Sequence, residues 1–416
     1  MKIRKDMMIL LICCALLVVG AIGMEWLKAN KSVKPAAIVT TFKGDPKTSR
    51  AFTWHSTNAH SDSIVQIIEG AAPSDWEEAL VMTFKGTTSS NDIGEDTLRG
   101  VHKAEATGLK PGTTYTYRVG SGEKETWSDA AQFKTEAEAS DAFTFINVTD
   151  SQGVTERDFE LWGNTLDQAF NVFPSSAFIV HNGDLTEEPT DEQAWTELFA
   201  KAGKWVTQVP FMPVTGNHDE VDGDAKRFVS QFNLPASGVK GSNAGTTYSF
   251  DYGSVHFVIL NSESNIKEQT SWLKKDLEST DKPWKIVALH QGPYGGNTNK
   301  KVKDWTALFD EFEVDLVLQG HNHEYSRSYP LRDGQITGDG NQAVQNRAGT
   351  VYVVTNTAGQ KFNEKKEDKF YHKVHFQNEK QMFAGITVNG DNLTYQAYDV
   401  EGAKLDEFVL QHGAAD

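Results

Sequence analysis

Cysteine is nearly absent from this sequence. Its two cysteines, Cys13 and Cys14, both fall in the apolar run MMILLICCALLVVGAIGM at 7–24. The rest of the chain can therefore form no disulfide, and core packing, with any bound metal, has to hold the fold. The residue before Cys13 is isoleucine, a poor neighbour for a lipoprotein-type attachment.

Positive charge is also in short supply. The chain has 40 Lys and Arg against 57 Asp and Glu, which gives a formal net charge of -17. This is the wrong sign for a protein that binds nucleic acid or an anionic membrane. A polyanionic substrate would need a local positive source, such as bound metal ions.

One apolar run stands apart from the rest of the chain. Three basic residues precede the run at 7–24, and the next charge is Glu25. A basic start followed by an apolar run is typical of a secretory signal peptide or an uncleaved membrane anchor. The run is at the lower limit for a bilayer span, which takes ~17–25 residues. We therefore expect residues 1–30 to be a signal peptide or an N-terminal membrane anchor, with the remainder secreted or anchored at the cell surface.

Short strands separated by turns dominate residues 33–137. The stretch TYTYRVG at 114–120 alternates apolar and polar side chains, as a half-buried strand does. Leu109, Pro111 and Tyr115 have the arrangement of a sandwich corner, where a Tyr hydroxyl bonds the backbone upstream. This part of the chain looks like a fibronectin type III β-sandwich, and another small β domain is the alternative. Its histidines lack metal-ligand spacing.

The pattern of expected secondary structure changes after the polar stretch TEAEAS at 135–140. Strand-like runs now alternate with amphipathic helical segments, for example RDFELWGNTLDQAF after FTFINVT, and DEQAWTELFAKAGKWV after SAFIVHNG. This pattern predicts βαβ units, with a sheet covered on both faces. TTYSFDYGSVHFVILN predicts a hairpin, and the late strands GTVYVVTN and FAGITVNGDNLTYQAYDV suggest a second sheet. The 416 residues are thus expected to form an all-β sandwich followed by an α/β domain with two mixed β-sheets flanked by helices.

Five of these apolar strands are directly followed by side chains that can bind a metal. They are Asp150, Asp184, Asn217 with His218, His290, and His321 with His323. In α/β sheets this edge is where ligands bind. Carboxylate, imidazole and amide oxygen together suit Mn, Fe or Zn and argue against calcium. Any one donor alone is explained by a core histidine or a capping asparagine, but the set in this order predicts a metal site.

The order D…GD…GNHD…VALH…GHNH resembles that of the calcineurin-like metallophosphoesterases. The fibronectin-like part and the ending GHNHEYSRSYP are similar to the purple acid phosphatase branch, and the resemblance covers about residues 36–412. It implies a catalytic domain at 141–412. Carried over residue by residue, it makes Asp184 the carboxylate that bridges two ions, with one ion completed by Asn217, His290 and His321 and the other by Asp150 and His323. His218 is then the catalytic imidazole that faces the leaving group.

The resemblance implies an exported, acid phosphatase-like phosphomonoesterase. Its cofactors would be two divalent or trivalent ions (Mn, Fe or Zn) with a hydroxide held between them, and its substrate a phosphorylated small molecule. A phosphodiesterase on the same site is one alternative. A non-catalytic exported binding module with a degenerate phosphatase domain is another.

Two positions depart from the family pattern. Members place His or Gly two residues after the first Asp, where this chain has Gln152, and the purple enzymes place Tyr where it has Glu187. We therefore expect no tyrosinate-bound purple iron. Gln152 and Glu187 either supply replacement oxygen ligands or are ordinary loop residues.

Several neighbours of these motifs are further candidates. Asp219 either orients His218 or has a capping or surface role. Tyr294 in HQGPYGGN and Tyr325 are expected at the substrate pocket, together with Asn217. Arg327 either binds phosphate oxygens bidentately or pairs with an Asp. His372 and His375 lie in a charged stretch, where a surface position or a contact at the rim is expected.

Overall fold

The computed structural model describes residues 34–413 except 78, 95–96, 140–141, 222, 342 and 346. The leader expected at residues 1–30 lies outside this range. None of the helices in the described range combines the length and the apolar character that a membrane span requires.

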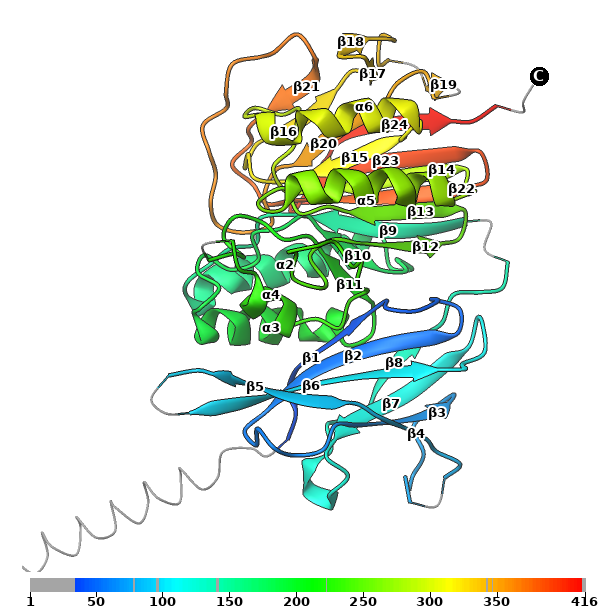
Figure 1. The fold of residues 1–416 in the computed structure, drawn as a ribbon, viewed down its shortest axis with the longest axis vertical. Coiled ribbons are helices and arrows are strands. Elements are labelled where there is room, and N and C mark those ends of the chain that lie inside the picture. The colour runs from blue at the N-terminus through cyan, green and yellow to red at the C-terminus, as the bar shows by residue number, and fades with distance from the viewer. Residues whose placement is uncertain are drawn as a thin grey trace, which may run out of the picture.

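Two four-stranded antiparallel sheets form the N-terminal domain, which lies below the larger domain in Figure 1. One sheet has the order β1-β2-β6-β5 and the other β4-β3-β7-β8. The strands are β1 (Ala36–Thr41), β2 (Ser49–Ser56), β3 (Ile64–Glu69), β4 (Met82–Lys85), β5 (Thr87–Asp92), β6 (Leu98–Thr107), β7 (Thr114–Gly120) and β8 (Ala131–Lys134), with a 3-10 turn η1 (Lys124–Thr126). The predicted corner is present, because the Tyr115 hydroxyl accepts the Lys110 N–H at 2.8 Å.

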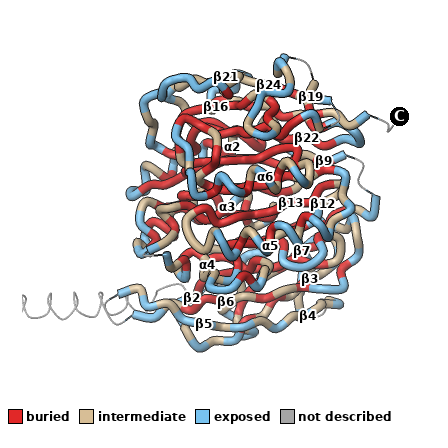
Figure 2. Tube along the Cα trace, turned by 45° about the horizontal axis from the view of Figure 1, so that its top comes forward, coloured by how far each residue is buried: buried red, intermediate tan, exposed pale blue. Residues whose placement is uncertain are grey.

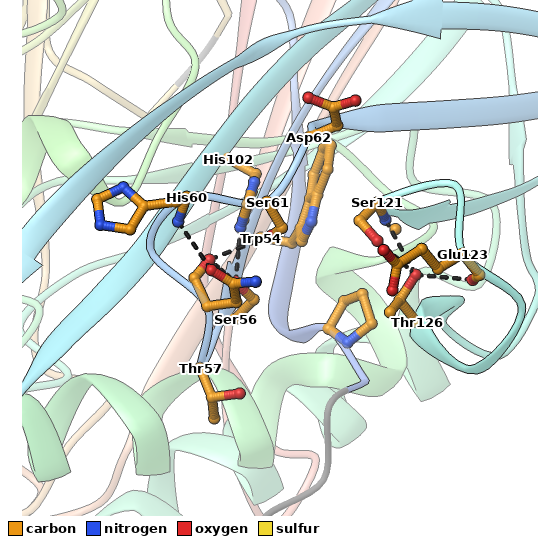
Figure 3. Close-up of a pocket in the computed structure, with 13 residues that line it drawn as sticks. Trp54, Ser56, Thr57, His60, Ser61, Asp62, His102, Ser121, Glu123 and Thr126 are labelled. Carbon is orange, nitrogen blue, oxygen red and sulfur yellow. Dashed lines mark hydrogen bonds between the residues drawn. The ribbon is translucent and has the colours of Figure 1, made fainter.

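The histidines of this domain serve packing or lie at its surface. His102 is buried, its ring stacks on Trp54 at 5.2 Å, and its Nε2 lies 2.7 Å from Ser56 Oγ. These residues line a cavity of about 370 Å³ with the exposed His60 at its rim (Figure 3). Among the described residues no acidic side chain bonds the His102 ring. His102 therefore has a packing role in the wall of this cavity.

Two seven-stranded mixed sheets form the larger domain. The first has the order β11-β10-β9-β22-β23-β24-β19 and the second β12-β13-β14-β15-β20-β16-β21. Their strands are β9 (Ala142–Val148), β10 (Ile179–His181), β11 (Phe211–Pro213), β12 (Tyr248–Tyr252), β13 (Val255–Ile259), β14 (Trp284–Ala288), β15 (Leu316–Gln319), β16 (Tyr325–Ser328), β19 (Val344–Gln345), β20 (Val351–Thr355), β21 (His372–Phe376), β22 (Met382–Asn389), β23 (Asn392–Asp399) and β24 (Lys404–Gln411). The small pair β17 (Leu331–Arg332) and β18 (Gln335–Ile336) stands apart.

The helices flank the two sheets. They are α2 (Glu156–Val172), α3 (Glu192–Val206), α4 (Lys226–Ser230), α5 (Ile266–Ser279) and α6 (Lys303–Glu311), with a 3-10 turn η2 (Lys300–Val302) before α6. The first helix begins at a capping box of Thr155 and Asp158 and buries Phe159, Trp162 and Phe170, as its apolar spacing predicts.

Each sheet faces the other sheet on one side and helices on the other. Along β13, Phe257 belongs to the core shared with the first sheet, where it meets Phe145 at 5.2 Å, whereas Val258 belongs to the core beneath α5 and α6. This is the two-residue alternation of a strand that is buried on both faces. Figure 2 shows the buried chain running through the centre of the molecule.

The arrangement of the late strands differs from the sequence prediction. β20 joins β15 in one sheet, while β22 and β23, linked by the predicted Asn389–Gly390 turn, extend the sheet of β9. The predicted fold class, a β-sandwich followed by an α/β domain with two mixed sheets flanked by helices, is confirmed. The expectation that helices cover both faces of a sheet was wrong, because each sheet packs one face against the other sheet.

The two domains share apolar packing. Val39 of β1 and the adjacent Phe42 belong to the main core of the larger domain. Thr41 Oγ1 donates to the Asn233 carbonyl at 2.6 Å, and Lys103 Nζ donates to the carbonyl of Phe232 at 2.6 Å. The first strand of the sandwich is therefore also a structural part of its neighbour.

Candidate metal centre

The side chains expected to bind metal follow five strands, three in one sheet and two in the other. β9, β10 and β11 are parallel neighbours that end before Asp150, Asp184 and Asn217. β14 and β15, also parallel, end before His290 and His321. Because the carboxyl ends of parallel strands share one edge, the fold gathers these residues at a single place.

Four of these residues have left-handed backbones. The φ angles are 55° at Asp150, 57° at Asp184, 73° at His321 and 49° at His323. Each such angle costs about 1–2 kcal/mol for a residue other than glycine. Residues in this conformation cluster at functional sites, where the surrounding structure over-determines them.

The side chains form two overlapping groups that share one carboxylate. Asp184, His290 and His321 offer ligand atoms within 4.8 Å of one another, and so do Asp150, Asp184 and His323. His290 Nε2 lies 3.1 Å from Asp184 Oδ2, and His323 Nε2 lies 3.1 Å from Asp150 Oδ1. The shared Asp184 therefore has the position that a bridging carboxylate requires.

Backbone carbonyls fix the orientation of two of the imidazoles. His290 Nδ1–H donates to the Asn182 carbonyl at 2.8 Å, and His323 Nδ1–H donates to the Lys361 carbonyl at 2.7 Å. Each ring thus presents Nε2 to the carboxylates, the arrangement that commonly orients metal-binding histidines. The carbonyl at 361 was not predicted, because a backbone acceptor leaves no signal in the sequence.

The electrostatics of the cluster suit a cation. Burial by itself would raise the pKa of Asp184, but His290 lowers it well below its usual range. Burial lowers the pKa of His290, yet the charge and hydrogen bond of Asp184 raise it to about 10. Burial and the neighbouring His290 lower the pKa of His321 to about 4, so this ring is neutral and has a free lone pair at neutral pH. Two fully buried carboxylates beside neutral or carbonyl-anchored imidazoles form a donor set that metal ions fit.

Two glycines leave room for the carboxylates. A Cβ at Gly216 of GNHD would clash with Asp184 Oδ1, and a Cβ at Gly320 of GHNH would clash with Thr149 Oγ1 and approach Asp150 Oδ2 to 2.9 Å. The glycine in each motif is therefore required by the close approach of the loops.

Asp219 ties the bridging loop to the GNHD loop. Its buried carboxylate accepts the N–H groups of Asp184 and Gly216, both at 2.8 Å, and that of Leu185 at 3.1 Å. The surface position considered for Asp219 was wrong, because the side chain is fully buried in these loops.

His218 lies at the rim of the cluster. Its backbone N–H donates to Asp184 Oδ1 at 2.8 Å, and its Nδ1–H donates to the Glu187 carbonyl at 2.8 Å. The side chain is 25% exposed, which leaves its other nitrogen available to a bound molecule. Asn217 Oδ1 lies within the cluster of candidate metal-binding residues, 3.2 Å from His290 Nε2.

Comparison with known proteins agrees with this geometry. Residues 35–135 match the family model of the purple acid phosphatase N-terminal domain, and residues 143–325 match that of the calcineurin-like phosphoesterases. The larger domain is thus similar to the calcineurin-like phosphoesterases.

The relatives that the chain matches include purple acid phosphatases. It is 29% identical to "Purple acid phosphatase 23" of Arabidopsis thaliana over 55% of its own length and 57% of the relative. It is 24% identical to an uncharacterised protein of Mycobacterium tuberculosis over 74% of its own length and 65% of that protein. It therefore spans only about three fifths of the length of these curated relatives.

A solved structure supports the fold. The purple acid phosphatase from yellow lupin (Lupinus luteus) seeds superimposes with a TM-score of 0.79 over 91% of this chain and 74% of the lupin chain, at 19% identity. The two-domain architecture, a β-sandwich followed by an α/β domain with mixed sheets, is thus that of a purple acid phosphatase.

The two residues that depart from the family pattern, Gln152 and Glu187, have different surroundings. Gln152 is 1% exposed, and neither of its amide atoms has a hydrogen-bond partner. The Glu187 carboxylate is 35% exposed and lies 3.7 Å from His218 Nδ1 and 3.9 Å from Lys361 Nζ. Gln152 therefore has an unsatisfied buried oxygen to offer, whereas Glu187 faces the rim.

The expected substrate contact of Tyr325 was wrong, and of the two roles considered for Arg327 the structure shows the ion pair. Both side chains lie on β16 and turn to Asp406 of β24, with the Tyr325 hydroxyl at 2.7 Å and Arg327 Nε at 2.7 Å. Tyr325 has no exposed surface, and the Arg327 side chain is only 7% exposed. The alternative of an ion pair between Arg327 and an Asp is what the structure shows.

Tyr294 also differs from its expected position. Its ring packs against Tyr352 at 4.6 Å and Tyr371 at 5.0 Å, and it lines a surface cavity with Lys303 and Asp310. None of the candidate metal-binding residues lines that cavity. Tyr294 therefore belongs to the packing beneath the HQGPYGGN loop.

Proposed function

We propose that this protein is an exported phosphomonoesterase of the acid phosphatase type that uses a two-metal centre. The single observation that carries the proposal is the shared position of Asp184, whose carboxylate belongs to both ligand groups. Similarity to the phosphoesterase family supports phosphoester hydrolysis, and the basic, apolar start of the sequence supports export.

The residues present would hold two ions in the following way. Asp184, Asn217, His290 and His321 would hold one, and Asp150, Asp184 and His323 the other, with Gln152 as a further oxygen donor beside Asp150. Manganese, iron and zinc all suit this set of carboxylate, imidazole and amide ligands. When bound, the ions supply Lewis-acid stabilisation of phosphoryl charge and acidify a water molecule.

His218 would act on the leaving group. Its Nδ1–H is held by the Glu187 carbonyl, so Nε2 is the nitrogen that hydrogen-bonds or protonates the departing oxygen. The Asn217 amide, beside His290, would orient a phosphoryl oxygen. Because Glu187 stands where a tyrosinate would bind iron, a purple charge-transfer band is not expected.

Two variants test the proposal by metal analysis and p-nitrophenyl phosphate turnover. Asp184→Asn should lose metal and activity together. His218→Ala should retain the metal and lose turnover by about 10²–10⁴-fold, the usual contribution of general acid–base catalysis. Unchanged turnover in His218→Ala would refute the role of this imidazole.

A panel of phosphate monoesters and diesters, assayed with the same metal restored, separates the alternatives. Preferential diester hydrolysis would assign the site to a phosphodiesterase. A folded protein without metal or turnover would favour a non-catalytic binding module instead.

A further inference from the structure

The strand β21 carries two histidines that face the same side although they are three residues apart. In a regular strand such residues point to opposite faces. Here Arg327 pairs with Val374 while Ser328 pairs with His372, so that Lys373 is an extra residue in β21. The rings of His372 and His375 consequently lie 4.0 Å apart. The expected surface position of His375 was wrong, since its side chain is only 2% exposed.

A carboxylate completes this group from the preceding loop. Asp368 Oδ1 lies 2.8 Å from His375 Nδ1, and Asp368, His372 and His375 offer ligand atoms within 4.8 Å of one another. The Asp368 side chain is 71% exposed, so the group is open to solvent on one side and walled by the protein on the other.

We propose that Asp368, His372 and His375 form a separate mononuclear site for a divalent transition metal, which we assign to Zn²⁺. Two imidazoles and one carboxylate, with an open side for water, are a ligand set that zinc accepts. The site is independent of the proposed two-metal centre, with which it shares no residue.

A buried carboxylate lies next to His375. Glu324 Oε2 is 3.2 Å from His375 Nε2, on the side of the ring opposite Asp368. Glu324 has no exposed surface, and neither its Oε1 nor His375 Nε2 has a hydrogen-bond partner. A zinc ion on His375 Nδ1 would place the ring proton on Nε2, where this carboxylate can accept it.

His372 supplies the second nitrogen. Its Nδ1 lone pair accepts the N–H of Lys369 at 3.2 Å, a long hydrogen bond that a zinc ion on this nitrogen would displace. Lys365 Nζ contacts Asp368 Oδ1 at 2.6 Å, and a bound zinc ion would displace this exposed ammonium.

Another histidine of the chain serves as a natural contrast. His256 lies between Asp251 at 2.7 Å and Asp276 at 2.9 Å, which is sufficient to hold a charged imidazolium. Among the described residues no second imidazole contacts it, and it belongs to none of the groups that could hold a metal ion. What distinguishes the Asp368 site is therefore its second imidazole ring.

A zinc ion at this site would also fix a segment that contacts the proposed two-metal centre. Residues 356–371 form the long connection between β20 and β21, orange at the left of Figure 1. This connection supplies the Lys361 carbonyl to His323 Nδ1, and the Asn363 N–H donates to the His323 carbonyl at 3.3 Å. A zinc ion that joins Asp368 to β21 would close this connection onto the strand.

Zinc content at buffered micromolar free zinc tests the proposal in the full chain. In the Asp184→Asn background, which disables the main centre, the protein should retain one zinc that is lost when Asp368→Asn or His372→Ala is added. His256→Gln, the matched control, should leave that zinc in place. Asp368 is exposed, so its exchange for asparagine should preserve the fold even if His372→Ala does not.

Equal zinc content with and without Asp368→Asn, in protein that is folded by circular dichroism, overturns the proposal. Loss of catalytic turnover in Asp184→Asn with retention of the Asp368-dependent zinc would leave both proposals standing. Turnover without any Asp368-dependent zinc would refute this inference alone.

Discussion

Replacing Asp406 by alanine should destabilise the protein while leaving its chemistry intact. The Asp406 carboxylate accepts Arg327 Nε at 2.7 Å, Arg327 Nη2 at 3.0 Å and the Tyr325 hydroxyl at 2.7 Å. The carboxylate and guanidinium side chains are each 7% exposed, and the guanidinium also lies over the Phe408 ring at 4.9 Å. The variant would therefore leave a buried cation without its partner.

The magnitude follows from that burial. Removing one partner of a buried ion pair costs about 3–5 kcal/mol, most of it from the charge left unpaired. Adding Arg327→Met removes that charge and keeps an apolar stem over Phe408. The double variant should therefore recover most of the loss, since a buried pair replaced by apolar side chains is often close to neutral. The coupling energy of the double-mutant cycle should be about 2 kcal/mol or more.

Urea denaturation of the four proteins measures the cycle, and turnover of p-nitrophenyl phosphate in the folded proteins provides the second readout. We expect kcat and KM of Arg327→Met to stay within about twofold of the wild type, a change of less than about 0.5 kcal/mol. A raised KM for Arg327→Met with unchanged stability would mean that Arg327 binds substrate, and the reasoning from its burial would be refuted.

Two further substitutions test other buried carboxylates and imidazoles. Asp219→Asn leaves one of three buried N–H donors without an acceptor and should cost about 1–3 kcal/mol of unfolding free energy in denaturant titrations. The matched change Asp191→Asn, at a helix N-cap, should cost less than about 0.5 kcal/mol, and an equal loss in both would contradict the role of Asp219. For His256, burial lowers the pKa, but the hydrogen bonds that its ring donates to Asp251 and Asp276 raise it to about 9. Since the folded pKa lies above the unfolded one, His256 stabilises the fold most at pH 6 and loses this effect as the pH rises through 9. His256→Gln should therefore cost up to about 3 kcal/mol at pH 6 and much less at pH 10, whereas a pH-independent difference would exclude the charged imidazole.

The sequence could predict the candidate centre because its signals are local. Each donor follows a buried strand, often after glycine, and parallel strands bring their ends together without further information. Asp150 and His321 are 171 residues apart in the chain, yet the His321 N–H donates to Asp150 Oδ2 at 3.0 Å. The same reasoning located the hairpin of β12 and β13 and the Asn389–Gly390 turn.

The failures have a different physical origin. Tyr325 and Arg327 share one face of β16, but a short strand buried on both sides does not reveal which face meets the site. Their partner Asp406 is 79 residues beyond Arg327. In β21 the bulge at Lys373 reverses the face of His372, and such an insertion leaves no mark in a charged sequence. Local pattern thus predicts where a strand ends better than where its side chains point.

The apolar packing of Val39 and Phe42 limits how this protein can be divided. A fragment that begins at the second domain would lose both side chains from its own core, and Phe42 alone contacts the rings of Phe178 and Phe250 at 5.6 Å. Grafting the second domain behind another sandwich would require that the incoming module bring an equivalent aromatic anchor. Separate inheritance of the two modules is therefore disfavoured unless the incoming sandwich supplies this anchor.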